Sequence, residues 1–167
     1  MKAAILGATG LVGQRFVQML NEHSWFEVAD LTGSDRSSGM LYGEAVNWRI
    51  ETGLKQKISE LTVQPSDPKN LDADVVFSAL PAEQALQIEE EFAAAGFPVV
   101  SNASSHRMDA DVPLMNPEAN FDHLSLIDEQ RRKRRWDGSL VTNPNCTTAV
   151  LTLPLKPIAE SFGLKNV

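Results

Sequence analysis

The chain has 167 residues, a hydrophobic content of 43%, and a formal net charge of −7 from 22 acidic and 15 basic side chains. A chain of this length buries roughly 70% of its unfolded surface, so we expect one domain, with part of a second. One cysteine excludes an internal disulfide, no apolar run approaches the ~20 residues that cross a membrane, and the acidic balance argues against nucleic acid as the main partner. The N-terminal segment MKAAILGATG breaks into glycines too early for a secretory signal, which predicts a reducing, cytoplasmic setting.

Short apolar segments alternate with helical patterns from the N-terminus onward. The continuous apolar run at 3–6 is typical of a strand buried on both faces, and apolar residues recur at helical spacing from 11 to 20. Further strands are predicted at 26–31, 61–63, 75–77, 98–100 and 140–142, and further helices at 81–95 and 122–135. This order predicts an α/β fold, a Rossmann-type doubly wound parallel sheet with right-handed crossovers.

Three segments fit the alternation poorly. Apart from 61–63, residues 37–70 are predicted to be loop or irregular structure. The apolar segment 147–162 carries Pro154 and Pro157, so a helix there should be kinked or broken. Residues 163–167 look like the start of another strand that has no partner in this sequence. We therefore expect the chain to be a piece of a longer protein.

A glycine-rich turn links the first predicted strand to the first predicted helix. It reads Gly7-Ala8-Thr9-Gly10-Leu11-Val12-Gly13, a GxxGxxG spacing in place of GxGxxG. Glycines let the backbone approach a pyrophosphate, and the free N–H groups at the helix N-terminus hold the anion. The alternative is a glycine-rich turn that binds nothing, but the strand–turn–helix context favours nucleotide binding.

A polar turn follows the second strand, where this fold meets the adenosine ribose of a dinucleotide. The strand ends in Leu31-Thr32-Gly33 and not in the acidic residue that selects NAD. The donors suited to a ribose 2′-phosphate are Ser34, Arg36, Ser37 and Ser38, which predicts NADP(H) as the cofactor. Asp35 leaves NAD as an alternative, and a plain polar surface turn is the structural alternative.

Two more candidate segments follow strands at the same predicted edge, where ligands of open α/β sheets bind. The first segment is Ser78, Ala79 and Leu80, where small residues would let a cofactor lie close to the backbone. A strand end that leads into a helix, without a ligand, explains this segment equally well. The segment SNASSHR at 101–107 ends in Arg107, which suits a substrate phosphate or carboxylate. A polar loop without a ligand fits that segment as well.

The only cysteine, Cys146, lies between a predicted strand and a predicted helix start, in the segment NPNCTT. Helix N-termini stabilise a thiolate and supply N–H groups for a developing oxyanion, and Asn145 adds another donor. A lone cysteine is more commonly a small buried hydrophobe. Its position at a strand end, flanked by amides, favours a catalytic thiolate.

Two further features are assigned no ligand. The run RRKRR at 131–135 resembles a nucleic-acid patch, but on an acidic chain it is predicted to be a solvated helix end whose cations suit the helix dipole. The three histidines, His23, His106 and His123, show no metal-ligand spacing with one another or with Cys146. No metal site is therefore predicted.

Taken together, GATGLVG, SDRSSG, SALP, SNASSHRMD, VPLMNPEAN and NPNCTT resemble, in this order, the aspartate-semialdehyde dehydrogenase family, and its archaeal and fungal branch in particular. The resemblance implies an enzyme that uses NADPH to reduce L-4-aspartyl phosphate to L-aspartate 4-semialdehyde, reversibly and with release of phosphate, on the pathway to lysine, methionine and threonine. It implies Cys146 as the nucleophile, Asn145 as its neighbour in the active site and Arg107 as a ligand of the substrate phosphate. It also implies a pyrophosphate loop at 9–12 and an adenosine-phosphate loop at 34–38.

The resemblance further implies a division of the chain. In the family, the acid/base histidine and the arginine for the amino-acid carboxylate come from a second domain, which also forms the dimer interface. We thus expect an NADP-binding Rossmann-like domain at 1–143, and at 144–167 the catalytic-cysteine segment with the truncated start of an α+β catalytic and dimerisation domain. The parent would be a homodimer or homotetramer.

Two expectations concern this chain by itself. Alone, it should bind NADPH weakly at best, show no turnover, and expose an apolar surface around 147–162. The alternatives in function are an acyl-CoA reductase of the same fold, such as malonyl-CoA reductase, and a non-catalytic NADP-binding module.

Overall fold

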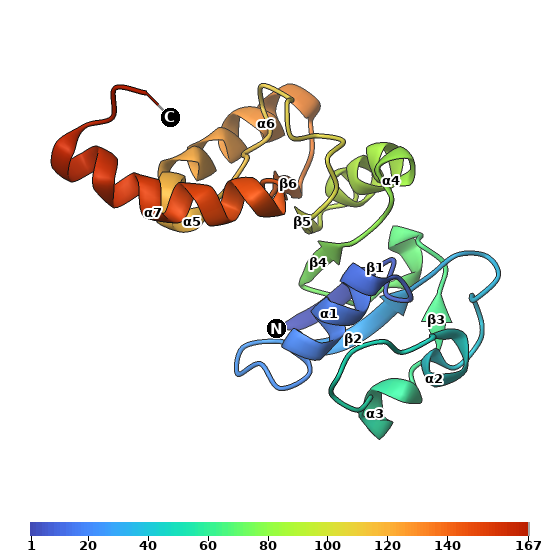
Figure 1. Cartoon of the computed structure of the whole chain (residues 1–167). Helices are drawn as coiled ribbons and strands as arrows, with labels where there is room; N and C mark the ends of the chain where they lie inside the picture. Colours follow the sequence, from blue (N-terminus) through green and yellow to red (C-terminus); the bar gives the residue numbers. More distant parts are fainter. Residues whose placement is uncertain (167) are drawn as a thin grey trace.

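A computed structural model of the chain describes residues 1–166 and contains a six-stranded sheet in which all strands run parallel (Figure 1). The strands are β1 (Lys2–Leu6), β2 (Glu27–Thr32), β3 (Val63–Gln64), β4 (Val75–Ser78), β5 (Pro98–Ser101) and β6 (Ser139–Thr142). Their order across the sheet is β3-β2-β1-β4-β5-β6. This is the order of a doubly wound dinucleotide-binding fold, with the reversal of winding between β1 and β4. The predicted fold class is confirmed.

The helices confirm the long predicted segments and correct the middle of the chain. They are α1 (Leu11–Leu20), α2 (Tyr42–Ala45), α3 (Gln56–Ser59), η1 (Pro68–Asn70), α4 (Ala82–Ala94), α5 (Pro117–Asn120), η2 (Phe121–Ser125), α6 (Leu126–Arg134) and α7 (Cys146–Phe162). The prediction of loop for 37–70 missed α2, α3 and η1, which are three or four residues long. Helices this short show no periodicity and are stabilised by tertiary packing.

The continuous apolar run of β1 is explained by cover on both faces of the sheet. Ala3 and Ile5 pack in a cluster that includes Val17 of α1. Ala4 and Leu6 face the opposite cluster, which includes residues of α4. Because successive side chains of a strand point to opposite faces, a strand between two helical layers needs apolar residues at every position.

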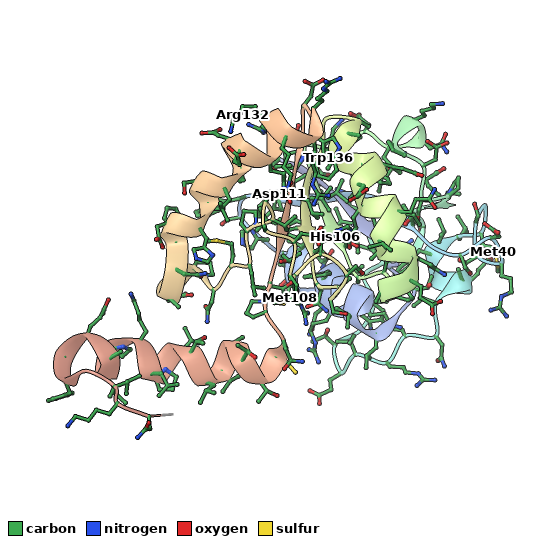
Figure 2. All side chains as sticks on the ribbon, turned by 90° about the horizontal axis from the view of Figure 1, so that it is seen from above. Met40, His106, Met108, Asp111, Arg132 and Trp136 are labelled. Carbon is green, nitrogen blue, oxygen red and sulfur yellow. The ribbon has the colours of Figure 1, made fainter. Side chains whose placement is uncertain are left out.

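The C-terminal segment differs from its prediction. Residues 146–162 form one continuous helix, α7, although Pro154 and Pro157 lie inside it, so the expected break is wrong. The prolines cannot donate to the carbonyl oxygens of Val150 and Leu153, four residues earlier, and both of these residues are exposed. Figures 1 and 2 show α7 extending away from the N-terminal strands.

The expected apolar surface on this segment is confirmed. The exposed large apolar side chains of α7 are Val150, Leu151, Leu153, Ile158 and Phe162.

Residues 163–166 do not form the strand that the sequence suggests, and Val167 lies outside the described residues. Among residues 1–166, no helix combines the length and the apolar character that crossing a membrane requires.

Candidate functional site

The turn after β1 is a tight packing junction that two of its glycines make possible. Gly7 has a positive φ of 70°, and a Cβ there would lie 2.9 Å from the carbonyl oxygen of Ala79. A Cβ on Gly13 would lie 2.3 Å from the carbonyl oxygen of Gly7. Both neighbours are backbone atoms that cannot move aside. These two glycines are therefore required by the packing of α1 against the turn and against the end of β4.

The third glycine, Gly10, occupies its position for a different reason. Its φ is −74°, and the nearest atom to a Cβ there is 3.4 Å away, an ordinary contact, so packing within residues 1–166 does not demand glycine. Gly10 is the N-cap of α1 and has no side chain to bond the first N–H groups of the helix. An exposed helix N-terminus with bare backbone is the arrangement that receives a phosphate group.

A cleft of about 560 Å³ opens in front of this turn. Of the predicted cofactor residues, it is lined by Gly7, Thr9, Gly10, Ser34, Ala79 and Leu80. These residues follow the carboxyl ends of β1, β2 and β4, so the parallel sheet brings the three predicted segments to one edge. Leu11 and Val12 are exposed at the start of α1, and Gly13 is buried behind the turn.

The polar turn after β2 divides its side chains between two environments. Ser37 is buried and its hydroxyl donates to the carbonyl oxygen of Ser34 at 2.9 Å, while the backbone N–H of Ser38 donates to the same oxygen at 3.0 Å. Ser37 therefore shapes the turn. Ser34 and Asp35 line the cleft, and the Arg36 side chain is exposed beside them.

Arg107, the predicted phosphate ligand, joins the ends of β5 and β6. Its Nε donates to the carbonyl oxygen of Asn143 at 2.9 Å, and its Nη2 donates to the carbonyl oxygen of Asn102 at 2.9 Å. The side chains of these two asparagines also bond to each other, from Asn143 Nδ2 to Asn102 Oδ1 at 2.9 Å. Part of the guanidinium thus fixes the segment that leads to Cys146, and Nη1 has no hydrogen bond within residues 1–166.

Cys146 is exposed and is the first residue of α7. Asn145 is the N-cap of this helix, and its Oδ1 accepts a hydrogen bond from the backbone N–H of Thr147 at 2.9 Å. The Cys146 Sγ lies 3.9 Å from the same Oδ1. The sulfur is therefore held at a helix N-terminus and open to solvent, not buried as a structural cysteine would be.

Cys146 also lies at the sheet edge that carries the cleft, since it follows β6 and all strands are parallel.

The sequence profile of the family described as "Semialdehyde dehydrogenase, NAD binding domain" matches residues 2–127. The chain belongs to this family. The match covers β1 to β5, including the glycine turn and the polar turn after β2.

Named relatives of the chain agree with the family assignment. An aspartate-semialdehyde dehydrogenase of Archaeoglobus fulgidus is 52% identical over 98% of the chain, which covers 47% of that protein. A malonyl CoA reductase (NADP) of Metallosphaera sedula is 45% identical over 100% of the chain, which covers 47% of that protein. The crystal structure of aspartate-semialdehyde dehydrogenase with NADP from Candida albicans superposes with a TM-score of 0.89 at 40% identity, over 98% of this chain and 48% of that one. The chain thus spans about half the length of the curated relatives it matches.

Ser78 is buried and does not line the cleft. Ser78 and Ser101 are register partners at the ends of β4 and β5, and both are fully buried. The Ser101 hydroxyl donates to Oε1 of Glu89 at 2.7 Å, and the Glu89 side chain is fully buried under the two strands. Burial raises the pKa of the Glu89 carboxyl, and its contacts with Ser78 and Ser101 oppose that rise only in part.

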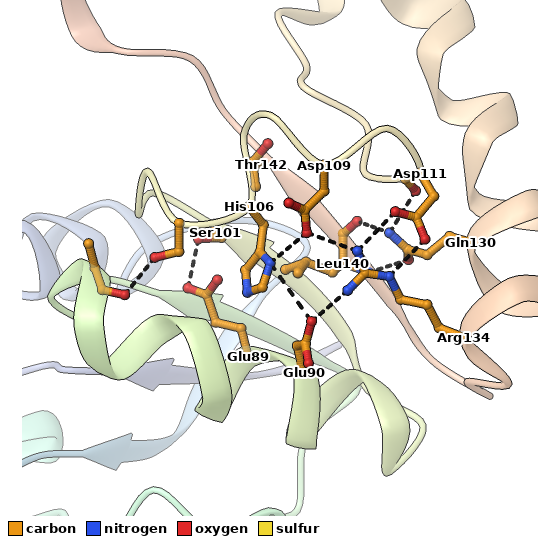
Figure 3. A network of polar contacts seen from close by, with 12 residues as sticks. Glu89, Glu90, Ser101, His106, Asp109, Asp111, Gln130, Arg134, Leu140 and Thr142 are labelled. Carbon is orange, nitrogen blue, oxygen red and sulfur yellow. Dashed lines mark hydrogen bonds and ion pairs between the residues drawn. The ribbon is translucent and has the colours of Figure 1, made fainter.

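An ionic cluster holds the segment that carries Arg107 against α4 and α6 (Figure 3). Arg134 donates from Nε to Asp111 at 2.7 Å, from Nη1 to Glu90 at 2.5 Å and from Nη2 to Asp109 at 2.8 Å. The prediction of a solvated arginine run is therefore wrong for Arg134, whose partners lie on other elements. The Arg134 guanidinium holds the pKa of the buried Asp111 carboxyl at about 2, well below its ordinary value.

The same cluster brings together three groups of the kind that bind metals. Ligand atoms of Glu90, His106 and Asp109 lie within 4.8 Å of one another. His106 is buried, and its Nδ1 lies 3.0 Å from Oδ2 of Asp109. Arg134 already supplies a fixed positive charge to both carboxylates, so the group is explained as an ion-pair network.

Sequence reasoning missed five residues that line the cleft. They are Pro65, Ser66 and Asp67 after β3, and Gln84 and Ile88 of α4. Residues 65–67 directly follow β3, so the rule that placed the other candidates at strand ends also applies here. The signal was weak because β3 has only two residues, Val63 and Gln64.

Proposed function

We propose that the chain is the cofactor-binding part of an aspartate-semialdehyde dehydrogenase and carries its nucleophile, Cys146. The parent would convert L-4-aspartyl phosphate to L-aspartate 4-semialdehyde, reversibly, on the pathway to lysine, methionine and threonine. The observation that carries this proposal is an exposed cysteine at the N-terminus of α7, on the same sheet edge as a glycine-turn cleft. The identities of 52% and 40% to named dehydrogenases support it.

The residues of the chain suit NADP(H) as the cofactor. The bare N-terminus of α1, with Thr9, Gly10, Leu11 and Val12, would hold the pyrophosphate. Ser34, Arg36 and Ser38 would bind the ribose 2′-phosphate, on a turn that the buried Ser37 hydroxyl shapes. Ala79 and Leu80 would let the cofactor pass close to the end of β4. When bound, NADPH supplies the hydride that reduces the acyl carbon.

The chemistry of the chain's own residues begins with the sulfur. The Cys146 thiolate would attack the carbonyl carbon of the acyl phosphate, a C–S bond would form, and the C–O bond to phosphate would break, with its electron pair leaving on phosphate. The oxyanion formed in this step would lie near the N–H groups that open α7 and the Nδ2 of Asn145. Arg107 Nη1 would bind the departing phosphate. After reduction, the C–S bond breaks, and the thiolate is restored as the aldehyde leaves.

The rest of the parent's organisation follows the same proposal. Residues 1–143 would form the NADP-binding domain, and residues 144–167 the catalytic-cysteine segment with the start of an α+β catalytic and dimerisation domain. That domain would supply the acid/base histidine and the group that binds the substrate carboxylate. The parent would be a cytoplasmic homodimer or homotetramer with small-molecule substrates and without nucleic-acid or membrane partners.

The test is a steady-state assay of the full-length protein with aspartate semialdehyde, phosphate and NADP, beside Cys146→Ser. We expect the wild type to form NADPH, and the variant to bind NADP with unchanged affinity but to lose turnover by at least about a thousandfold, since its attacking thiolate is gone. Activity that persists in the variant would favour a non-catalytic role for the cysteine.

A second candidate is malonyl-CoA reductase, because a relative of that name is 45% identical over the whole chain. It would use the same thiolate but release coenzyme A in place of phosphate. Parallel assays with malonyl-CoA and NADPH separate the two substrates. Turnover of malonyl-CoA without turnover of the semialdehyde and phosphate would replace the first proposal.

A further inference from the structure

The glycine turn is supported from behind by Gln14, a polar side chain of α1 that is only 2% exposed. Its Nε2 donates to the carbonyl oxygen of Thr9 at 3.0 Å and to that of Asn47 at 3.1 Å. Its Oε1 accepts from the backbone N–H of Arg49 at 2.8 Å. One buried amide therefore fastens the glycine turn to the segment 47–49, with both of its ends bonded.

A second buried donor meets the neighbouring carbonyl. Tyr42 opens α2 and is fully buried, and its hydroxyl donates to the carbonyl oxygen of Ala8 at 2.8 Å. Burial also raises the pKa of Tyr42, so the phenol remains a donor. The position of Tyr42 is itself fixed, because its backbone N–H donates to the carbonyl oxygen of Leu61 at 2.8 Å.

These contacts have an electrostatic consequence for an anion in the cleft. A backbone turn binds phosphate when its N–H groups face the anion and its carbonyl oxygens do not. The two carbonyls that precede Gly10 belong to Ala8 and Thr9, and each is held by a donor from the protein interior. The N–H groups of Ala8 and Gly10 already donate to the carbonyl oxygens of Thr32 and Gly7. The turn can therefore offer an anion the N–H groups of Thr9, Leu11 and Val12, which have no acceptor within residues 1–166, without a carbonyl rotating into the cleft.

We propose that Gln14 and Tyr42 are positioning residues that keep the glycine turn in its anion-binding conformation. This role rests on the proposed binding of NADP(H). No residue of the segment 41–49 lines the cleft, and the segment thereby gains a role in cofactor affinity. Neither residue touches the cofactor in this proposal. Both act through the backbone of the turn.

The variants Gln14→Met and Tyr42→Phe remove the donors while they keep side-chain size. Gln18→Met is the matched control, because Gln18 is also on α1 and its Nε2 donates at 3.0 Å to Thr52 Oγ1, away from the turn. In the full-length protein, the dissociation constant for NADPH is measured by fluorescence titration. The dissociation constant for adenosine 2′-monophosphate, which carries the 2′-phosphate but no pyrophosphate, is measured by competition or calorimetry.

We expect each of the two variants to weaken NADPH binding by about tenfold, because each loses one buried hydrogen bond to a carbonyl of the turn. The two other bonds of Gln14, to Asn47 and Arg49, do not reach the turn. Adenosine 2′-monophosphate should bind the variants as it binds the wild type, and Gln18→Met should change neither constant. Gln14→Glu keeps the acceptor for Arg49, replaces the donor with a negative charge, and should weaken NADPH further. If Gln14→Met unfolds, Tyr42→Phe, which removes a single oxygen, still decides the question.

Two results would overturn the proposal. In one, NADPH binds both variants within twofold of the wild type; in the other, NADPH and adenosine 2′-monophosphate weaken equally, as general loss of structure would cause. A wild-type protein that binds neither nucleotide would instead overturn the proposed function, and the positioning role with it.

Discussion

The substitution Asp111→Asn tests whether the ionic cluster stabilises the fold as the geometry indicates. Asp111 is 4% exposed at its side chain and accepts two bonds from Arg134, at 2.7 Å from Nε and 2.9 Å from Nη2. Its pKa is lowered from the ordinary value of 3.8 to about 2, chiefly by the hydrogen bonds to Arg134. At about 1.4 kcal/mol for each pH unit, this difference corresponds to about 2.5 kcal/mol of folding free energy at pH 7.

The sign of the pH dependence follows from the direction of the pKa change. Because the folded state lowers the pKa of Asp111, its contribution is complete above the unfolded pKa near 4 and is lost as the pH falls toward about 2. The free energy of unfolding in urea should therefore differ between wild type and Asp111→Asn by about 2.5 kcal/mol at pH 7 and by roughly half of that at pH 3. The control is Asp72→Asn, which removes an exposed ion pair with Lys2 and should change stability far less. A difference between wild type and Asp111→Asn that stays constant from pH 7 to pH 3 would refute the electrostatic explanation and leave only a packing defect.

Three further predictions concern the cofactor, the buried carboxyl and the chain alone. Arg36→Ala should weaken NADPH by roughly 10- to 100-fold and leave NADH unchanged, as the loss of one charge-assisted bond to a 2′-phosphate requires; equal effects on both cofactors would contradict the assignment. Because burial raises the pKa of Glu89, the wild type loses stability as the pH rises above the unfolded pKa of 4.5, so Glu89→Gln should become more stable relative to wild type as the pH rises from that value, measured by denaturation; the opposite trend would mean that the carboxyl is ionised when folded. The 167-residue chain by itself should bind NADPH weakly and show no turnover with semialdehyde, phosphate and NADP; turnover like that of the full-length enzyme would contradict the need for a second domain.

The sheet could be predicted from the sequence because burial on both faces leaves a plain pattern. The apolar run that became β1 and the helical spacing that became α1 needed no knowledge of distant contacts. The segment 37–70 could not be predicted in this way, since its short helices depend on anchors such as Tyr42, whose hydroxyl bonds to a residue 34 positions away. The same limit explains the error at Arg134, because sequence proximity shows four neighbouring cations and none of the carboxylates that bind it.

The segments of the candidate site could be predicted from the sequence because each of them directly follows a strand. The segments after β1, β2, β4, β5 and β6 were all identified by this rule, and the parallel sheet places them along one edge. The rule identifies which residues reach the edge but not what their side chains do there. Ser78 is buried below the cleft, and the Ser37 hydroxyl bonds within its own turn. Two nitrogens of Arg107 donate to backbone carbonyl oxygens. Such roles depend on side-chain direction, which spacing in the sequence does not encode.

The strand order also constrains how a cofactor can reach the sulfur. β1, which leads to the glycine turn, and β6, which leads to Cys146, are separated by β4 and β5. Three steps at about 4.8 Å per strand place these two edges about 14 Å apart. A dinucleotide folded over the glycine turn alone would leave Cys146 without a hydride donor in reach. Under the proposed function, the cofactor would therefore extend from the glycine turn across the end of β4 toward β5 and β6, where Ala79 lines the cleft. The end of β5 on this path is fixed from below by the buried Glu89 carboxyl, which accepts from the Ser101 hydroxyl.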